Sequence, residues 1–240
     1  MTDGRKLQRL FDEHATVLAP TLLGCELTVT TAGGSVSVRL TEVEAYGGQG
    51  EDPGAHSFNG RTARNSSLFG PPRHTYVYLN YGIHRCLNLA CGAEGTAGGV
   101  LLRAGEVMEG RSLAVERRGG RETGIKLLSG PGRLGQGLGI ELSMDAQPLE
   151  FSEQSVGEQS LGEQDARGQA AAQGDEVLFG APARFRLSPP TDPVPEERQR
   201  SGPRVGVSGV GGSGEFPWRW WIDGDRSVSA YRPGKNVPGR

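Results

Sequence analysis

The chain has 240 residues, 35% of them hydrophobic, and a net charge of -2, so it can bury one core and is predicted to form a single domain. Its three cysteines are too few for the disulfide framework of a small secreted protein, and no Cys or His spacing indicates a structural zinc site. No segment resembles a signal peptide or an apolar run of about 18 residues, so we expect a cytoplasmic protein that is neither exported nor inserted in a membrane.

The first half of the chain predicts short helices followed by paired strands. Apolar side chains recur at helical spacing over residues 7–23, where Pro20 is expected to break or kink the helix and Gly24 to end it. Alternating apolar and polar residues then predict a hairpin of 25–31 with 35–46, a strand pair of 74–81 with 86–91, and a third strand of that sheet at 99–104.

The second half predicts helices over 106–118 and 133–140, the latter entered through Gly130-Pro131-Gly132. Residues 152–174 contain a five-residue repeat with few apolar anchors, so we expect a disordered loop there. The other predicted strands are 148–151 and 176–179, which form a hairpin around this loop, and then 184–187, 204–208 and 218–222. Because strands and helices do not alternate regularly, the pattern favours an α+β fold with a mainly antiparallel sheet.

Charge is distributed unevenly along the chain. Residues 152–176 hold six acids and one arginine, so the remainder of the chain is net positive. The stretch from Pro53 to Ala93 has no acid, and it interleaves basic with aromatic side chains: Arg61, Arg64, Arg73 and Arg85 with Phe58, Phe69, Tyr76, Tyr78 and Tyr81. Such a segment suits the binding of phosphates and bases, although a chance gap in acid usage would give the same pattern.

Two glutamates lie close together at the end of the predicted strand 35–46. In an extended strand Glu42 and Glu44 share a face with the three apolar residues that precede them at alternate positions, and so continue an apolar stripe. A carboxylate in a partly apolar, aromatic-lined site can act as a general base or stabilise a charge. The same acids could instead pair with an arginine such as Arg39 or Arg103. Strand parity alone does not separate the two glutamates.

A second cluster is the tyrosine-rich strand that ends at Gly82. Tyr76 and Tyr78 share one face, which is also what ordinary sheet packing would give. Tyr81 has the opposite parity and lies where the chain turns. An aromatic side chain at a hairpin tip has little core to join, but in a DNA-binding protein it can act as a wedge that fills the space left by an extruded nucleotide.

These residues belong to an ordered series of short motifs. The series reads Glu42-Val43-Glu44-Ala45-Tyr46, Ala55-His56-Ser57, Arg64-Asn65, Tyr76-Val77-Tyr78 with Tyr81-Gly82, Asn88, Leu101-Leu102-Arg103-Ala104, Gly130-Pro131-Gly132-Arg133-Leu134 and Arg204-Val205-Gly206-Val207. In this order it resembles the alkyladenine (3-methyladenine) DNA glycosylases, from about Leu22 to Val228 without the repeat loop. Each motif is common by itself, whereas the ordered series is specific.

The resemblance implies a single compact α+β domain, a curved sheet flanked by helices, and a protruding β-hairpin that enters the DNA minor groove. Glu44 then matches the carboxylate that activates the attacking water, and Arg103 matches the arginine near that water and a phosphate. Tyr81 would be the intercalating wedge.

The resemblance also implies how the damaged base is held. Tyr46 would form one wall of the base pocket, with His56 and Tyr78 as the other. Asn88 would lie at the pocket mouth, where an amide can exclude purines that carry an extra exocyclic group.

The implied activity is that of a monofunctional DNA glycosylase of base excision repair. It would flip alkylated or deaminated purines of the 3-methyladenine, 7-methylguanine, ethenoadenine and hypoxanthine class out of duplex DNA and hydrolyse the N-glycosidic bond, leaving an abasic site. Alkylation makes the purine cationic and a good leaving group, so a water held beside a carboxylate can suffice, and aromatic faces stabilise the charged ring. No lysine lies in the pocket motifs, so we expect no lyase activity.

The implied partner is double-stranded DNA containing damaged purines, bound by a monomer that associates with the chromosome, and no metal or organic cofactor is expected. Arg61, Arg64, Arg73 and Arg85 are the candidate DNA-binding residues. Arg73 stands where relatives often have glycine, and Arg85 stands where an apolar or aromatic residue is more usual. Both substitutions add positive charge near the expected DNA face.

Two other interpretations remain open. A nucleic-acid-binding module could keep the scaffold without catalysis, although the presence of all the pocket and catalytic motif residues argues against it. A glycosidase acting on free nucleosides or sugars could use Glu42 and Glu44 as paired acids, since alternate strand residues lie about 7 Å apart, a separation in the inverting range. The acid-free arginine segment and the hairpin-tip tyrosine would have no use on so small a substrate.

Overall fold

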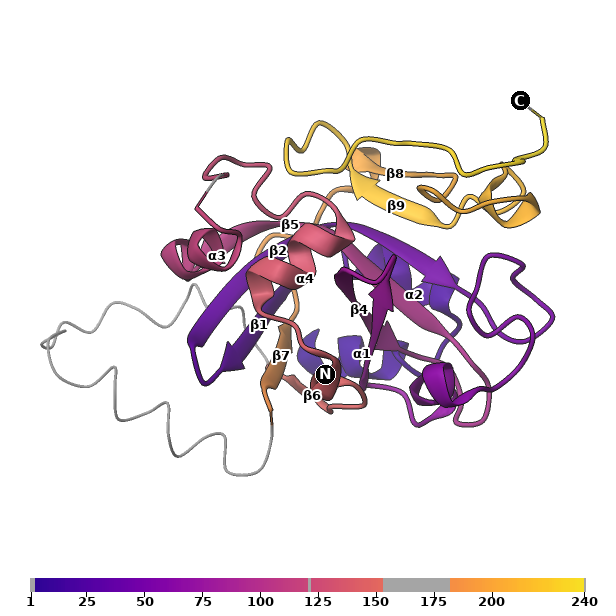
Figure 1. The fold of residues 1–240 in the computed structure, drawn as a ribbon, viewed down its shortest axis with the longest axis horizontal. Coiled ribbons are helices and arrows are strands. Elements are labelled where there is room, and N and C mark those ends of the chain that lie inside the picture. The colour runs from indigo at the N-terminus through magenta and orange to yellow at the C-terminus, as the bar shows by residue number, and fades with distance from the viewer. Residues whose placement is uncertain (1–2, 121, 153–181, 240) are drawn as a thin grey trace, which may run out of the picture.

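The computed structural model describes residues 3–120, 122–152 and 182–239, and these form one curled, mixed sheet with short helices packed on it (Figure 1). The α-helices are α1 (Asp3–Leu10), α2 (Ala15–Thr21), α3 (Arg111–Arg117) and α4 (Pro131–Leu138). The 3-10 helices are η1 (Ala63–Phe69), η2 (Leu142–Met144), η4 (Glu196–Arg198) and η5 (Val210–Gly212). The strands are β1 (Glu26–Thr31), β2 (Gly34–Tyr46), β3 (Thr75–Asn80), β4 (His84–Ala90), β5 (Gly99–Glu109), β6 (Leu149–Phe151), β7 (Arg184–Ser188), β8 (Gln199–Gly202) and β9 (Arg219–Ile222).

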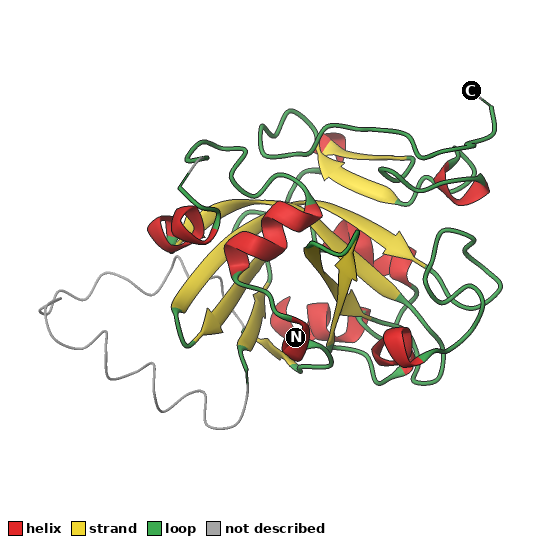
Figure 2. Cartoon of the chain, viewed as in Figure 1, coloured by secondary structure: helices red, strands yellow, loops and turns green. Residues whose placement is uncertain are grey.

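Strand β2 lies at the centre of the sheet, whose order is β3-β4-β5-β2-β1-β7-β6, with β9 pairing with both β2 and β8. The predicted hairpin of the first two strands is confirmed, as are the strand pair β3–β4 and its third member β5. Strands β6 and β7 run parallel, while the other strand pairs among the described residues are antiparallel. Figure 2, seen from the same side as Figure 1, shows the curled sheet with helix α4 lying in front of it.

Two sequence-based predictions of secondary structure are wrong, and a third falls largely outside the described residues. Residues 106–109, expected to begin a helix, continue β5 because Val107 pairs with Val38, and the break comes only at Gly110, which has φ 71°. Residues 204–208, expected to be a strand, form a turn and loop that includes Gly206 with φ 73°. Strand β6 pairs with β7 in parallel; its expected hairpin partner at 176–179 and nearly all of the expected disordered loop at 152–174 lie outside the described residues.

A β-bulge in β2 changes which face its side chains occupy. The register runs from Leu40 opposite Gly105 directly to Glu42 opposite Ala104, so Thr41 is the extra residue. Residues Val36, Val38 and Leu40 before the bulge and Val43 and Ala45 after it all join the core. The prediction that Glu42 and Glu44 continue the apolar stripe is therefore wrong, because the bulge switches the core face from even to odd positions.

The larger of two hydrophobic clusters is shared by the curled sheet and helices α1, α2, α3 and α4, and the smaller one consists of Leu68, Phe69, Tyr76 and Ala97. The predicted helix 133–140 is present as α4, but it begins two residues earlier, at Pro131 directly after Gly130, and ends at Leu138. Its Gly135 packs against β4 so closely that a Cβ there would overlap the carbonyl oxygen of Arg85. The glycine-rich run thus serves close helix–sheet packing. In the parts of the chain that the structure describes, no helix has the length and apolar character needed to cross a membrane.

Candidate active site

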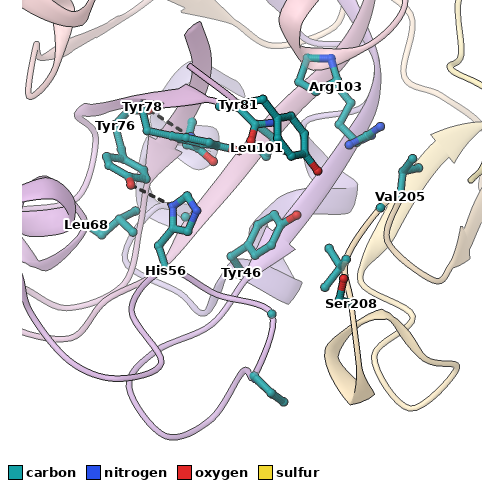
Figure 3. Close-up of a pocket in the computed structure, with 18 of the residues that line it drawn as sticks. Tyr46, His56, Leu68, Tyr76, Tyr78, Tyr81, Leu101, Arg103, Val205 and Ser208 are labelled. Atoms are coloured by element: carbon teal, nitrogen blue, oxygen red, sulfur yellow. Dashed lines mark hydrogen bonds between the residues drawn. The ribbon is translucent and has the colours of Figure 1, made fainter. Parts of the chain in front are cut away.

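A cavity of about 620 Å³ opens beside the second half of β2. It is lined from β2, the following loop, the β3–β4 hairpin, β5 and the loop 205–208. Figure 3 shows the rings of Tyr46, His56 and Tyr81 directed toward this space from three separate segments, with Arg103 and Val205 beyond Tyr46. The structure therefore brings together five of the residues that the motif series singled out, although they span most of the chain.

Glu44 is fully buried and does not itself line the cavity, but it lies directly behind residues that do. Its Oε2 accepts hydrogen bonds from the hydroxyl of Tyr46 at 2.8 Å and from Nη1 of Arg103 at 3.1 Å. Its Oε1 accepts one from the backbone N–H of Val205 at 2.6 Å. All three donor residues line the cavity. The carboxylate is thus separated from the open space by its own hydrogen-bond donors, which fix both of its oxygens.

Glu42 belongs to a different environment, because it is enclosed by two arginines and a serine. Arg103 Nε donates to Glu42 Oε1 at 2.9 Å and Arg219 Nε donates to the same oxygen at 2.7 Å. Ser229 donates to both oxygens through its backbone N–H and its hydroxyl. Burial opposes the charge of Glu42, but the two guanidinium groups and Ser229 lower its pKa below the ordinary value. Glu42 is therefore an ionised anchor for Arg103 and does not line the cavity.

Behind Tyr46 lies a buried ion pair that sequence reasoning missed. Arg204 and Asp52 are both fully buried, and two hydrogen bonds of 2.6 Å join the guanidinium to the carboxylate. Arg204 Nη1 also donates to the backbone oxygen of Ala45 at 2.9 Å. Its guanidinium carbon lies 4.5 Å from the centre of the Tyr46 ring. Arg204 thus supports the Tyr46 ring and, through the next peptide group, the N–H of Val205 that contacts Glu44.

The Tyr46 hydroxyl stays protonated at this position. Burial, with the neighbouring charge of Glu44, raises the pKa of Tyr46 well above its ordinary value. A protonated hydroxyl can donate to a carboxylate, which agrees with the 2.8 Å contact between the two groups. Tyr46 therefore presents an aromatic face to the cavity while it orients Glu44.

The opposite wall consists of three stacked or edge-packed rings. Tyr76 and Tyr78, which share a face of β3 as predicted, lie with ring centres 5.6 Å apart, and His56 meets Tyr78 edge-on at 4.6 Å. His56 Nδ1 is 3.0 Å from the Tyr76 hydroxyl, a contact drawn in Figure 3. Burial, and then the nearby charge of Arg64, lower the pKa of His56, while burial raises the pKa of Tyr76 to about 12. The wall is therefore uncharged near neutral pH.

Asn88 lies on β4 directly opposite Tyr76, and its side-chain amide donates to the Tyr76 backbone oxygen at 3.1 Å. It lines the cavity together with Gly99 and Leu101 of β5. Because this hydrogen bond uses its N–H, the amide is held in one orientation at the cavity surface. That fixed position is compatible with the steric role expected for Asn88.

Tyr81 is the most exposed large aromatic side chain of the described residues, with 84% of its surface accessible, yet it borders the cavity. The turn is closed by the Ile83 N–H donating to Asn80 O at 3.1 Å, and both Tyr81 and Gly82 have positive φ values of 50° and 73°. A bulky residue at positive φ is uncommon and costs on the order of 1 kcal/mol. The hairpin thus holds an aromatic ring in solvent, beside the cavity, at a conformational cost.

The four candidate DNA-binding arginines occupy different surroundings. Arg61 is exposed, and Arg64 donates to Leu79 O while its guanidinium lies 5.8 Å from the centre of the Tyr78 ring. Arg85 pairs with Glu141 at 2.9 Å on the side of the hairpin. Arg73 pairs with Asp12 at 2.8 Å beside α1 and does not border the cavity. The structure therefore groups Arg64 with the cavity wall and leaves Arg73 apart from it.

The sequence of the chain matches a family model described as methylpurine-DNA glycosylase over residues 9–226, which is most of its length. The chain belongs to this family. That membership confirms the resemblance of the motif series to DNA glycosylases of the 3-methyladenine type. Arg204, Val205 and the aromatic residues of the cavity wall all lie within the matched region.

Several curated relatives of this chain are named "Putative 3-methyladenine DNA glycosylase". The protein of this name from Streptomyces avermitilis is 44% identical over 90% of this chain and 86% of its own length. The one from Nocardia farcinica is 41% identical over 95% of this chain and 93% of its own, and the one from Cutibacterium acnes is 41% identical over 91% and 96%. The similarity thus extends over nearly the whole of each protein.

Sequence reasoning missed the polar and charged residues that hold Glu42 and Tyr46. Asp52, Arg219 and Ser229 belong to no motif, and Arg204 belongs to one whose buried ion pair the sequence does not reveal. Arg232, near the end of the chain, also lines the cavity. Among the described residues, no group of histidine, cysteine or acidic side chains could hold a metal ion. The sequence signal for these buried arginines is the residues next to them. Arg219 stands between Trp218 and Trp220, and Arg204 stands two residues from Gly202 and from Gly206.

Proposed function

We propose that this protein is a monofunctional DNA glycosylase of base excision repair that hydrolyses the N-glycosidic bond of alkylated or deaminated purines. Family membership supports a DNA glycosylase. The observation that carries the finer proposal is the position of Glu44 beneath an aromatic cavity, where Tyr46, Arg103 and Val205 each donate to its carboxylate. The purine would be sandwiched between Tyr46 and the wall of His56 and Tyr78.

The chemistry follows from the unused capacity of Glu44. A carboxylate has about four lone-pair positions, and three of them accept the hydrogen bonds from Tyr46, Arg103 and Val205. A water molecule in the cavity would take the remaining position, lose a proton to Glu44 and attack C1′ of the extruded nucleotide. The bond from C1′ to the purine nitrogen breaks, and its electron pair leaves with the base, most readily when alkylation has made the ring cationic.

Access to the lesion requires the nucleotide to leave the base stack. The exposed ring of Tyr81, held out on a strained turn beside the cavity, is suited to fill the gap in the duplex. Arg61 and Arg64 lie on the segment that follows Tyr46 and could contact the backbone phosphates. We therefore propose that the β3–β4 hairpin enters the minor groove.

The alternatives fit the site less well. Four hydrogen bonds from Arg103, Arg219 and Ser229 occupy the carboxylate of Glu42 and leave it no position for a water, which argues against a pair of catalytic acids acting on free sugars. A binding module without catalysis would not need Glu44 buried beneath the cavity among three hydrogen-bond donors. The described cavity lining includes no lysine, which supports hydrolysis without a Schiff-base lyase step.

The proposal is tested with a panel of duplexes that each carry 3-methyladenine, 7-methylguanine, ethenoadenine or hypoxanthine, incubated with the protein and cleaved with alkali at abasic sites. We expect release of at least one of these bases by the wild type, and no strand cleavage without alkali. The variant Glu44→Gln keeps the size of the side chain and should reduce base release by a factor of about 1,000 or more, with little change in affinity for lesion DNA.

The matched control is Glu106→Gln, which removes a carboxylate that pairs with Arg39 away from the cavity. It should excise at the wild-type rate. Excision by Glu44→Gln at a rate near that of the wild type would disprove the assignment of the base. Failure of the wild type to release any of the four bases would disprove the proposed substrate range.

A further inference from the structure

The segment that follows β9 packs onto the active site although the family match ends at residue 226. Figure 1 shows this C-terminal segment running alongside β8 and β9. Farther along, its backbone joins the loop that lines the cavity, with Gly206 N donating to Arg232 O at 2.8 Å and Gly209 N donating to Lys235 O at 2.9 Å. The end of the described chain is thus attached directly to the loop that carries Val205.

Within this segment, Ser229 contacts Glu42, Arg103 and Arg219, which together form a buried charge cluster. Its N–H donates to Glu42 Oε2 at 2.7 Å, and its hydroxyl donates to Glu42 Oε1 at 2.9 Å. Arg219 Nη2 donates to the Ser229 carbonyl oxygen at 3.0 Å, and Arg103 Nη2 lies 3.4 Å from its hydroxyl oxygen. Two hydrogen bonds from one residue, one to each carboxylate oxygen, fix the orientation of Glu42.

That orientation controls Arg103. The guanidinium is a rigid planar fork, with Nε on Glu42 at 2.9 Å and Nη1 on Glu44 at 3.1 Å. Because Glu42 holds one edge of this plane, its position determines where the Nη1 atom lies relative to Glu44. A rotation of Glu42 would therefore turn Arg103 away from the carboxylate proposed to activate water.

We propose that Ser229 is a positioning residue that holds Glu42, and through it Arg103, in the arrangement that fixes Glu44 beneath the cavity. The inference rests on the proposed function of Glu44. It assigns a role in catalysis to a part of the chain beyond the matched family region. We call the chain of contacts from Ser229 through Glu42 and Arg103 to Glu44 the relay.

The groups that face Glu42 also give this relay a dependence on pH. They are Arg103 from β5 and Arg219 from β9, with Ser229 from the C-terminal segment and Glu44 two residues along β2. Ser229 and the two arginines keep the pKa of Glu42 low, so Glu42 remains ionised as the solution becomes acidic. Removing the serine hydroxyl raises that pKa. Glu42 then takes up a proton at a higher pH and releases Arg103 there.

The test compares Ser229→Ala with Ser227→Ala, a matched control in the same segment. The Ser227 hydroxyl contacts Thr41 at 2.7 Å and Asp225 at 2.7 Å and does not touch the charge cluster. We expect Ser229→Ala to lower the single-turnover rate of base release about tenfold, as for the loss of a hydrogen bond to a charged group, with unchanged affinity for lesion DNA. The acid limb of its pH–rate profile should move to higher pH, while Ser229→Thr restores the wild-type profile.

Ser227→Ala should keep the wild-type rate and pH profile, even if its melting temperature falls as much as that of Ser229→Ala. Equal rates and profiles for the two alanine variants would overturn the inference, because Ser229 would then only anchor the segment. The proposed function is read separately in the same assay. If wild-type protein releases bases and Glu44→Gln does not, the proposed function stands whatever Ser229→Ala shows.

Discussion

The guanidinium of Arg204 packs on the ring of Tyr46, with 4.5 Å between the guanidinium carbon and the ring centre. The Arg204 side chain is fully buried there. Its charge is compensated by Asp52, which is equally buried. The wall proposed to stack on a damaged purine is therefore supported from behind by an ion pair. The stability of this pair and the geometry of the cavity are consequently linked.

The first prediction concerns this pair. Asp52→Asn leaves Arg204 buried without a counter-charge, so we expect a loss of about 3–5 kcal/mol in the free energy of unfolding, measured by urea denaturation. The control is Asp223→Asn, whose partner Arg200 is solvent-exposed and whose loss should change stability little. Similar unfolding free energies for the two variants would show that the buried pair does not stabilise the fold.

The second prediction concerns the hairpin tip. Tyr81→Ala should weaken binding to lesion-containing duplex by about 1–3 kcal/mol, the contribution of one aromatic stacking contact. Tyr81→Phe should bind as the wild type does, because the ring alone fills the gap. Fluorescence anisotropy with duplexes of equal sequence, with and without the lesion, measures both. Unchanged affinity for the alanine variant would refute the wedge.

The third prediction uses the lowered pKa of His56, which burial and then Arg64 cause. Because the folded pKa lies below the unfolded value of about 6.5, the unfolded chain takes up the proton first as the pH falls. The stability associated with neutral His56 is thus complete above pH of about 6.5 and is lost as the pH falls toward the folded pKa.

Arg64→Gln should raise the His56 pKa without restoring it fully, because burial remains. A titration of the imidazole resonances by NMR measures the shift directly. A His56 titration that is the same in the variant and the wild type would contradict the electrostatic part of the explanation.

The fourth prediction concerns Arg232, an exposed residue that lines the cavity. If it contacts a phosphate beside the extruded nucleotide, Arg232→Gln should lower the slope of log affinity against log salt concentration by about 1. Arg226→Gln, in the same segment but away from the cavity, should leave the slope unchanged. A slope equal to that of the wild type would remove Arg232 from the DNA interface.

Much of the fold could be predicted because its signals are local. Alternation over six to thirteen residues placed β1, β2, β3 and β4, and the Tyr81-Gly82 pair marked the turn between the last two. The prediction failed at 106–109, where helical spacing in the sequence was overridden by pairing of β5 with β2. It also failed at 204–208, where the side chain of Arg204 is drawn into the interior and the backbone turns at Gly206.

By itself, the sequence determined the order of motifs and therefore the family, and through that resemblance it made Glu44 the candidate base. Only the tertiary structure decided what these residues do to one another. The bulge at Thr41 depends on the register of β2 against β5, which strand periodicity cannot reveal. Asp52 meets Arg204 across 152 positions and Ser229 meets Glu42 across 187. Pairing of buried charges is a property of the folded packing, because only there does the loss of solvent make each partner necessary.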